Sequence, residues 1–415
     1  MQDLTITAIG AQGDGLARTA DGKPAFIPLT LPGETVSAQF DGARGEVIEI
    51  VTPSPDRVAP PCRHYGVCGG CALQHWAGEP YRAWKAEQVR IQLSMEGLET
   101  EILPTFAAPP ASRRRVALHA RKGGKGQGAR LGFKERRSWN LVPLEECPVT
   151  DPRLVAALPA LARLAEPFLE HPKSAPTLHV TLTATGLDID ITGVERKSGG
   201  LSADARMRAA MAAGEGDFAR VTLAGETIYG ARQPLVKLGP AIVALPPGSF
   251  LQAVPAAEKA MVELAVAEAQ GAGRVADLYC GVGTFTFRLA EVAPVYAAEM
   301  SAPAIAALKA AVGATPGLKP ITAEARDLVR RPVLSTELAK TDVVVIDPPR
   351  AGAAEQTVEI AKSKVFKVVG VSCNPQTFAK DARVLVDAGF KLVRVTPVDQ
   401  FVWSPHIELV GVFTR

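Results

Sequence analysis

Residues 368–375 read Val368-Val369-Gly370-Val371-Ser372-Cys373-Asn374-Pro375. The apolar run predicts a buried strand, which Asn374-Pro375 terminates. Open α/β sheets bind their ligands outside the carboxyl ends of the strands, so Cys373 is predicted to lie where a ligand binds. A thiolate is the strongest ordinary side-chain nucleophile, which makes Cys373 a candidate for covalent catalysis. The alternative is that Cys373 is a small buried apolar residue, the usual state of a free cysteine.

Two other stretches favour the catalytic interpretation, because each is a further strand that ends in glycine or polar residues. They read Asp277-Leu278-Tyr279-Cys280-Gly281-Val282-Gly283-Thr284 and Val344-Val345-Ile346-Asp347-Pro348-Pro349-Arg350. From about residue 247 onward, strands and helices alternate, which predicts a doubly wound α/β domain over residues 247–415. Its expected helices cover residues 285–292, 303–312 and 377–388.

The glycine-containing loop at 281–283 directly follows one of these strands and opens a helix. Glycine there lets a ligand approach the backbone, and Glu299, at the end of the next strand, is the usual type of partner for ribose hydroxyls. The pattern fits a nucleoside-type cofactor, either a dinucleotide or S-adenosylmethionine. Thr286 stands in place of the third glycine of the dinucleotide fingerprint. Asp277 and Asp347 favour a methyltransferase.

The composition is that of a folded protein with more than one domain. The chain has 415 residues, of which 47% are hydrophobic and 21% charged, so two or three domains are expected. No apolar run reaches membrane-spanning length and no signal-peptide pattern opens the chain, which predicts a cytoplasmic protein without a membrane partner. We expect a monomer, although no pattern in the sequence tests the oligomeric state. Six cysteines are too few for a disulfide scaffold and indicate metal binding or catalysis.

The N-terminal part, residues 1–57, alternates like short strands between Gly and Pro turns and predicts a small β-barrel. Barrels of the OB type often bind RNA, and inert packing is the alternative. Residues 58–246 are expected to form a mixed α/β central domain. A helix at about 80–95 within it is expected to pack on the catalytic domain, and residues 151–246 receive no catalytic role.

The central domain opens with a cluster of cysteines. Cys62, Cys68 and Cys71 lie in a glycine-rich run, and glycine lets the backbone wrap closely around an inorganic centre. A fourth ligand is needed, and Cys147 is the best candidate because the two remaining cysteines lie at strand ends. Zinc and a four-iron cluster both accept four thiolates, and the spacing does not choose between them.

The most basic part of the chain is 112–137, where ten Lys and Arg residues stand against one Glu, a charge of +9 in a chain of net +3. Its pattern predicts a hairpin with a mobile tip at 122–128. Such a hairpin suits phosphate contacts because each neutralised phosphate releases counterions. A solvated charged face is the alternative. The predicted RNA-binding residues are Arg113, Arg114, Arg115, Arg121 and Lys122.

Together these stretches resemble the S-adenosylmethionine-dependent RNA uracil-C5 methyltransferases over nearly the whole chain. The N-terminal part resembles their TRAM domain, and the four cysteines match the ligands of a [4Fe-4S] cluster in the ribosomal-RNA branch. The most specific matches are Asp347-Pro348-Pro349-Arg350, Ser372-Cys373-Asn374-Pro375 and His406-Ile407-Glu408. The resemblance implies a Rossmann-like catalytic domain, a nucleophile at Cys373 and a general base at Glu408. It implies cofactor contacts at Gln252, Tyr279, Gly281, Gly283, Thr284, Glu299, Asp327 and Asp347.

The sequence departs from the family pattern at three places. The run Phe250-Leu251-Gln252-Ala253-Val254 has lost one polar group, Thr284 stands where Asn is familiar, and the approach to Glu408 reads Phe401-Val402-Trp403-Ser404-Pro405. These departures leave the chemistry in place and leave the target uridine open. The ribosomal-RNA branch makes 23S ribosomal RNA the expected substrate, and transfer RNA is the alternative. Two other classes of protein remain as competing interpretations, a dinucleotide-dependent redox enzyme and a non-catalytic RNA-binding protein.

Overall fold

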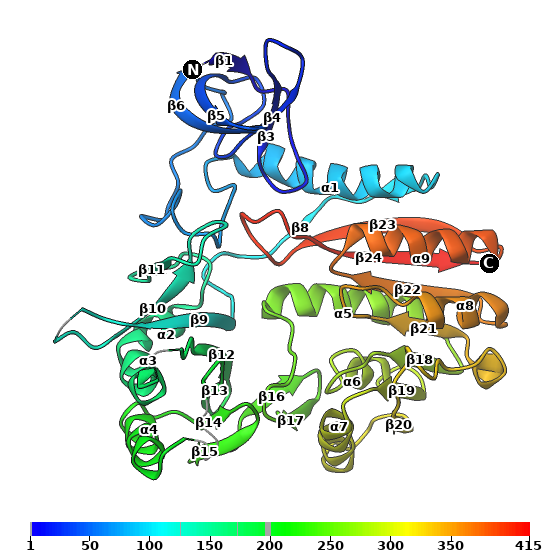
Figure 1. Cartoon of the computed structure of the whole chain (residues 1–415). Helices are drawn as coiled ribbons and strands as arrows, with labels where there is room; N and C mark the ends of the chain where they lie inside the picture. Colours follow the sequence, from blue (N-terminus) through cyan, green and yellow to red (C-terminus); the bar gives the residue numbers. More distant parts are fainter. Residues whose placement is uncertain (1, 125, 172, 196–200) are drawn as a thin grey trace.

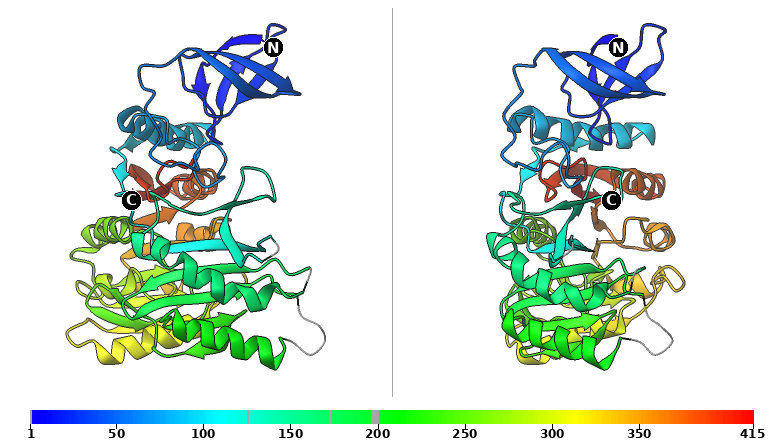
Figure 2. Two further views of the ribbon diagram at one scale, coloured as in Figure 1. Left: turned by 90° about the vertical axis from the view of Figure 1, so that its left-hand side faces the viewer. Right: turned by 60° about the vertical axis from the view of Figure 1, so that its left-hand side comes forward.

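The computed structural model describes residues 2–124, 126–171, 173–195 and 201–415. Figure 1 shows the N-terminal strands lying above a long helix, α1 (Gly78–Met95), with the central sheet and the C-terminal α/β domain side by side below it. Figure 2 shows the same arrangement after rotation, with the central sheet turned toward the viewer. Within the described residues, no helix is both long enough and apolar enough to cross a membrane.

The N-terminal part is a six-stranded sheet with the order β1-β5-β6-β4-β3-β2. Its apolar interior includes Leu4, Ile27 and Val36, all buried. Trp84 of α1 donates its indole N–H to the carbonyl of Ile9 at 3.0 Å, which fixes the sheet on the helix. The strands are β1 (Gln2–Thr5), β2 (Ala8–Ile9), β3 (Gly15–Arg18), β4 (Pro24–Ile27), β5 (Thr35–Asp41) and β6 (Arg44–Thr52).

The central part is a seven-stranded sheet with the order β11-β10-β9-β12-β13-β14-β15. Helices α3 (Leu158–Ala165) and α4 (Ala203–Glu215) bury their apolar sides, including Leu161 and Ala209, against this sheet. The strands are β9 (Arg115–Lys122), β10 (Ala129–Lys134), β11 (Leu141–Pro143), β12 (Thr177–Thr183), β13 (Gly186–Thr192), β14 (Arg220–Leu223) and β15 (Glu226–Gly230). The short helix α2 (Pro152–Ala156) completes this part. The separate hairpin of β16 (Leu235–Leu238) and β17 (Ala241–Ala244), which was expected in the central domain, packs instead against α7 (Ala302–Ala314) of the C-terminal part.

The C-terminal part is a nine-stranded sheet with helices on both faces, so the predicted doubly wound α/β domain is confirmed. Strands β20, β19, β18, β21 and β22 run parallel, and β24 is antiparallel to β22. Seven of its strands are β18 (Val275–Leu278), β19 (Val295–Glu299), β20 (Ile321–Ala325), β21 (Val343–Ile346), β22 (Lys367–Ser372), β23 (Lys391–Asp399) and β24 (Glu408–Thr414), and the other two come from residues 101–107.

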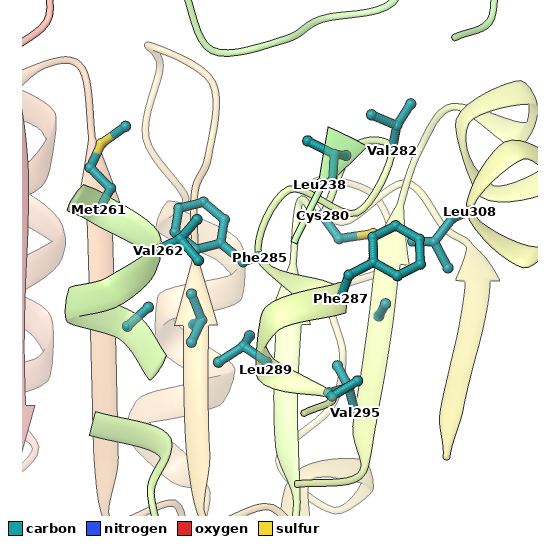
Figure 3. Close-up of a cluster of buried hydrophobic side chains, with 14 of the residues drawn as sticks. Leu238, Met261, Val262, Cys280, Val282, Phe285, Phe287, Leu289, Val295 and Leu308 are labelled. Carbon is teal, nitrogen blue, oxygen red and sulfur yellow. The ribbon is translucent and has the colours of Figure 1, made fainter. Parts of the chain in front are cut away.

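Two apolar layers enclose this sheet. Helices α5 (Pro255–Ala269), α6 (Thr286–Leu289) and α7 (Ala302–Ala314) cover one face. Figure 3 shows part of that layer, where Phe287 packs beside Cys280 and Leu308 under the glycine loop. Helices α8 (Ala354–Lys362), α9 (Pro375–Asp387) and α1 cover the other face. The sheet edge where the parallel strands end therefore lies between two packed layers.

Helix α1 packs on the C-terminal part, against α9 and β23, as expected for the helix at about 80–95. The structure differs from the sequence-based expectation at other points. The segment after α1 also joins the C-terminal part, because the two-residue strands β7 (Glu101–Ile102) and β8 (Phe106–Ala107) pair with β23. The helix expected at 285–292 is the four-residue α6. It ends early because the N–H groups of Glu291 and Val292 donate to the carbonyls three residues before them, on Arg288 at 3.3 Å and on Leu289 at 3.0 Å, which closes a turn instead of extending the α-helix.

Candidate active site and cysteine cavity

Cys373 follows the last residue of β22, as the sequence predicts, and its side chain is partly exposed. Asn374 caps helix α9 through the Gln376 N–H at 3.2 Å and donates its side-chain amide to the carbonyl of Arg350 at 3.1 Å. The nucleophile loop is thereby tied to the loop that follows β21. Burial raises the pKa of the Cys373 thiol to about 11, and the charges of Glu408 and Asp347 act in the same direction. Arg350 acts in the opposite direction.

A chain of side-chain amides joins the two carboxyl groups that surround this thiol. Gln400 donates one hydrogen bond to Glu408 at 2.8 Å and another to the Gln252 side-chain oxygen at 2.9 Å. Gln252 in turn donates to Asp347 at 3.1 Å. All but Asp347 are less than 5% exposed, so water does not screen the chain. The structure therefore brings together the expected nucleophile, the expected base and two expected cofactor residues.

Burial governs the protonation of both carboxyl groups. It raises the pKa of Glu408 to about 8, with a further contribution from the Asp347 charge, while the Gln400 hydrogen bond and Lys85 act in the opposite direction. Burial also raises the pKa of Asp347 to about 7, and the hydrogen bond from Gln252 opposes it. A carboxyl group with a pKa near the working pH can both accept and release a proton.

The glycine loop lies at the same edge of the sheet. Tyr279, Gly281 and Gly283 have positive φ angles of 63°, 57° and 101°. A side chain at Gly283 would place its Cβ 2.5 Å from the Phe287 ring, so the turn requires glycine there. Glu299 accepts hydrogen bonds from the Gly281 N–H at 3.3 Å and the Ser301 N–H at 2.8 Å, which places its carboxylate beside the loop.

Two polar groups of the glycine loop are available to form hydrogen bonds with a bound ligand. Within the described residues, the Asp277 Oδ1 atom and the Tyr279 hydroxyl are buried without a hydrogen-bond partner. Burial raises the pKa of Asp277 to about 7, and the charges of Asp347 and Glu299 add to this shift. A cationic ligand with hydroxyl groups would satisfy these atoms and lower the cost of burying the acids.

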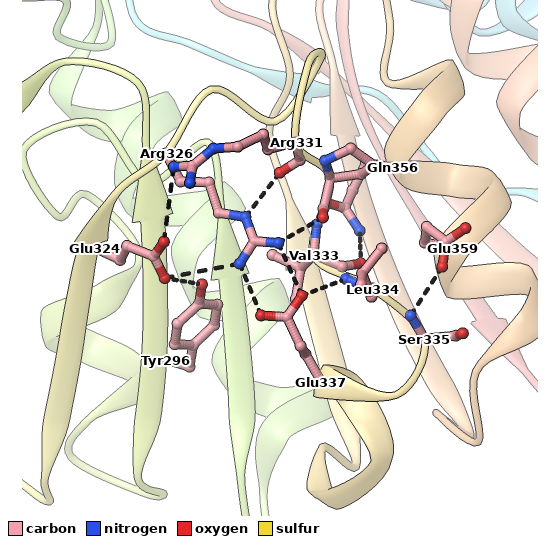
Figure 4. Close-up of polar contacts among 11 residues, drawn as sticks. Tyr296, Glu324, Arg326, Arg331, Val333, Leu334, Ser335, Glu337, Gln356 and Glu359 are labelled. Carbon is pink, nitrogen blue, oxygen red and sulfur yellow. Dashed lines mark hydrogen bonds and ion pairs between the residues drawn. The ribbon is translucent and has the colours of Figure 1, made fainter.

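Asp327 is held at this edge by the segment that follows β20. Its carboxylate accepts hydrogen bonds from the Val329 and Arg330 N–H groups at 3.0 and 3.2 Å. Figure 4 shows how the neighbouring Arg326 anchors the segment, with its guanidinium on Glu337 at 2.8 Å and on backbone carbonyls of the same loop. The charges of Asp327 and Glu299 both act on Tyr279, so these residues share one site. Thr284, another expected contact, is half-buried in the glycine loop.

A second site lies between the central sheet and the C-terminal part. A cavity of about 260 Å³ is lined by four cysteines together with apolar side chains and Arg113. The Thr150 hydroxyl donates to the Cys147 sulfur at 3.2 Å, and the Gly70 N–H approaches the Cys68 sulfur at 3.5 Å. The four cysteines are Cys62, Cys68, Cys71 and Cys147. Among the described residues, no group of three His, Cys, Asp or Glu side chains is arranged around a single metal ion.

The arginines expected to bind RNA lie in two different environments. Arg114 pairs with Glu258 of α5, both about one-tenth exposed, and Arg115 donates to the Leu251 carbonyl at 2.8 Å. Arg113 lies over the Phe401 ring at 5.6 Å. These three residues therefore join the central sheet to the C-terminal part, which corrects their expected place on an open hairpin. Arg121 and Lys122 lie farther along β9, where Lys122 is exposed. The hairpin tip includes Lys125, which is outside the described residues.

Sequence reasoning missed Gln400 and Lys85. Gln400 follows β23 and lies just outside the quoted run that leads to Glu408, and only its contacts reveal its place beside the base. Lys85 of α1 is fully buried, pairs with Asp399 at 2.8 Å and donates to the His406 carbonyl. A Lys at an apolar helix position is the one sequence signal that could have shown it, because a buried Lys needs a partner.

The fold and the site are those of a Rossmann-like domain with a candidate methyltransferase centre, preceded by a small N-terminal sheet. The matched families agree: residues 242–415 match the tRNA (Uracil-5-)-methyltransferase family, and residues 1–44 match the TRAM domain. An RNA methyltransferase of Caulobacter vibrioides is 94% identical over the whole of both chains. The 23S rRNA (uracil(1939)-C(5))-methyltransferase RlmD of Halomonas elongata is 34% identical, with 98% of this chain and 88% of that protein covered.

A solved structure shows the same fold over the full length. The tRNA (uracil-54, C5)-methyltransferase of Pyrococcus abyssi, in complex with S-adenosyl-L-homocysteine, matches with a TM-score of 0.75 and 22% identity, and each chain is covered completely. The chain belongs to the RNA uracil-5-methyltransferase family and is an S-adenosylmethionine-dependent RNA methyltransferase. This family membership sets aside the redox enzyme and the non-catalytic RNA-binding protein.

Proposed function

We propose that this enzyme forms 5-methyluridine in 23S ribosomal RNA through a covalent adduct between Cys373 and uracil C6. The observation that carries the proposal is the position of the Cys373 thiol, at the end of β22 and within the electrostatic reach of Glu408 and Asp347. The similarity to the Halomonas enzyme over nearly the whole chain supports the ribosomal substrate.

The chemistry needs a nucleophile and a base because uracil C5 is itself a poor nucleophile. Addition of the Cys373 thiolate to C6 makes C5 enolate-like, so that C5 can attack an electrophilic methyl group. S-adenosylmethionine supplies that methyl group when it is bound. Glu408 then removes the C5 proton, and the electron pair of the C5–H bond restores the ring double bond as the thiolate leaves. The target uracil must leave its stack to reach both side chains.

The acidic glycine-loop site would hold S-adenosylmethionine. Gly281, Gly283 and Thr284 would line the ligand, and Glu299 is placed for ribose hydroxyls. The two unpartnered atoms, on Asp277 and Tyr279, mark this site as incomplete in the free protein. Gln252, Asp327 and Asp347 would complete the contacts, and the amide chain links the cofactor residues Gln252 and Asp347 to the base Glu408.

The cysteine cavity would hold a [4Fe-4S] cluster. The charges of Cys62, Cys68 and Cys147 all act on the Cys71 thiol, whose pKa burial raises to about 12, so the four sulfurs surround one space. Four thiolates on one zinc ion would lie about 3.8 Å apart, given Zn–S bonds of about 2.3 Å. The four cysteines here line a cavity of about 260 Å³, which has room for the larger four-iron centre that the family resemblance implies. Arg113 lines the same cavity and would offset the negative charge of the centre.

The experiment that tests the function compares RNA from a strain lacking the gene with RNA from its parent. Mapping of 5-methyluridine should show one ribosomal uridine unmodified in the deletion strain and restored by the wild-type gene but not by Cys373→Ala. Purified enzyme should methylate an unmodified 23S transcript. Methylation of tRNA transcripts alone would transfer the same chemistry to transfer RNA, and no methylation of either RNA would contradict the proposal.

A further inference from the structure

Trp139 is the large apolar side chain most exposed to solvent among those described, at 77%. It lies in the turn between β10 and β11, and the Lys134 ammonium group is 3.8 Å from the centre of its ring. An exposed indole with a cation on one face leaves the other face free for a flat partner. No catalytic or cofactor role described above uses this residue.

The turn that carries Trp139 is held by its own hydrogen bonds. The Glu135 N–H donates to the Asn140 carbonyl at 3.0 Å, and the Asn140 side chain donates to the Glu135 carboxylate at 2.9 Å. The Ser138 hydroxyl accepts from the Asn140 N–H at 3.0 Å. The indole is therefore presented by a defined turn, which lowers the entropy lost when a partner binds.

The turn is also fixed to the cysteine loop. The Gly69 N–H, between Cys68 and Cys71, donates to the Lys134 carbonyl at 2.9 Å. A Cβ at Gly69 would lie 2.9 Å from that same oxygen and 3.1 Å from the Arg136 backbone, so the two segments approach as closely as glycine allows. The cysteine loop, residues 68–71, therefore helps to hold the turn that carries Trp139.

The N-terminal sheet holds the turn from the other side and leaves an excess of positive charge. Asp14, only 3% exposed, pairs with Arg136 at 2.8 Å, with Arg44 at 3.1 Å and with Arg137 at 3.4 Å. Three guanidinium groups on one carboxylate give a local charge of +2, and the Glu135 carboxylate of the same turn balances the Lys134 ammonium group, so the excess remains +2. An aromatic ring inside a basic surface is the pattern that proteins use to bind single-stranded nucleic acid.

We propose that Trp139 is a stacking platform for an unpaired base of the substrate RNA, on a surface built jointly by the N-terminal sheet, the cysteine loop and the β10–β11 turn. The inference rests on the proposed function, since it takes the RNA substrate as the partner. The base occupies the ring face opposite Lys134, and Arg137 and Lys134 contact the flanking phosphates. The same surface explains why the cysteine loop and the N-terminal sheet meet at this turn.

The test measures binding of an unmodified 23S transcript to the full-length protein. Trp139→Ala should weaken the affinity about 5- to 150-fold, the range that corresponds to a stacking energy of about 1–3 kcal/mol. Trp139→Phe should retain most of the affinity because it keeps a ring. Met95→Ala, at an apolar side chain that is 73% exposed on α1, is the matched control and should bind like the wild type.

Two further readouts separate stacking from charge and from misfolding. RNA should quench the emission of the wild-type protein more than that of Trp139→Phe, because Trp76 and Trp84 are buried and the half-buried Trp403 is present in both proteins. The dependence of affinity on salt should be unchanged in Trp139→Ala and reduced by about one ion in Lys134→Met. Wild-type affinity in Trp139→Ala together with equal quenching would overturn the platform, even if the enzyme methylates RNA. Failure of the wild type to methylate any RNA would instead contradict the proposed function.

Discussion

Replacement of Glu408 by Gln should separate the two halves of the reaction. Gln keeps the size and hydrogen-bonding shape of the side chain but cannot accept the C5 proton. Cys373 should still add to uracil and methyl transfer should follow, after which the enzyme has no base to release the product. We expect Glu408→Gln to accumulate a protein–RNA adduct that survives denaturing electrophoresis. The double variant with Cys373→Ala should form none, and Glu99→Gln at an exposed glutamate should turn over normally.

The pH dependence follows from the two raised pKa values. The pKa of Glu408 is about 8, so its ionised fraction rises from about 1% at pH 6 to about 50% at pH 8, and product release should accelerate roughly 50-fold over that interval. The pKa of Cys373 is about 11, so thiolate formation should rise about tenfold per pH unit through this whole range. The rate of product release should therefore stop rising above about pH 8 to 9, whereas the rate of thiolate attack should continue to rise.

Glu408→Gln should also change the rate at which the Cys373 thiolate attacks uracil C6, and the direction of this change follows from the charge of Glu408. The Glu408 charge raises the pKa of the Cys373 thiol, and this charge is present in the wild type only above about pH 8. Rapid mixing followed by denaturing electrophoresis should therefore show faster adduct formation in the variant at pH 9 and equal rates at pH 6.5. Normal turnover of Glu408→Gln without an adduct would refute the assignment, and Asp347 would be the next base to examine.

Three other outcomes are expected. Anaerobically purified protein should be brown and contain about four irons per chain. The Cys147→Ala variant should lose this iron, whereas the control Cys280→Ala should keep it. Stoichiometric zinc in place of iron would exclude the cluster. The affinity for S-adenosylmethionine, measured by calorimetry, should rise from pH 6 to pH 8, because Asp277 and Asp347 ionise near pH 7 and only their ionised forms attract the sulfonium. An affinity that does not change with pH would mean that these two carboxylates do not contact the cofactor. Arg114→Met should lower the free energy of unfolding by about 3–5 kcal/mol, because it leaves Glu258 buried without its partner. The double variant Arg114→Met/Glu258→Leu should recover this stability. The salt dependence of RNA binding should not change in either variant.

The sequence predicted those parts of the site that lie at the ends of regular strands. Cys373, Asp347 and Gly281 each come shortly after the carboxyl end of a buried strand, and parallel strands bring such ends to one edge of a sheet. The two-residue strands β7 and β8 could not be predicted in this way, because so short a segment carries no periodicity. Their place beside β23 depends on tertiary contacts alone.

Buried charges were predicted less well than strand ends. The run of arginines at 113–115 has the same composition whether it faces phosphate or a neighbouring domain, and only Glu258 and the Leu251 carbonyl reveal which applies. Gln400 was missed for a related reason, since a single amide has no sequence pattern. Its role depends on having Gln252 and Glu408 within hydrogen-bonding distance at once.

The loop between β23 and β24 links the cysteine cavity to the base. The Ala72 and Leu73 N–H groups, directly after Cys71, donate to the Trp403 carbonyl at 2.8 and 3.0 Å. The Trp403 N–H donates to the Tyr81 hydroxyl at 2.8 Å, and that hydroxyl donates to Asp399 at 2.7 Å, one residue before Gln400. We therefore expect a change in the cysteine loop to shift the backbone that orients Gln400 and, through it, Glu408. A variant such as Cys71→Ala should then lower the rate of methylation as well as the stability of the protein, because one short loop contacts both sites.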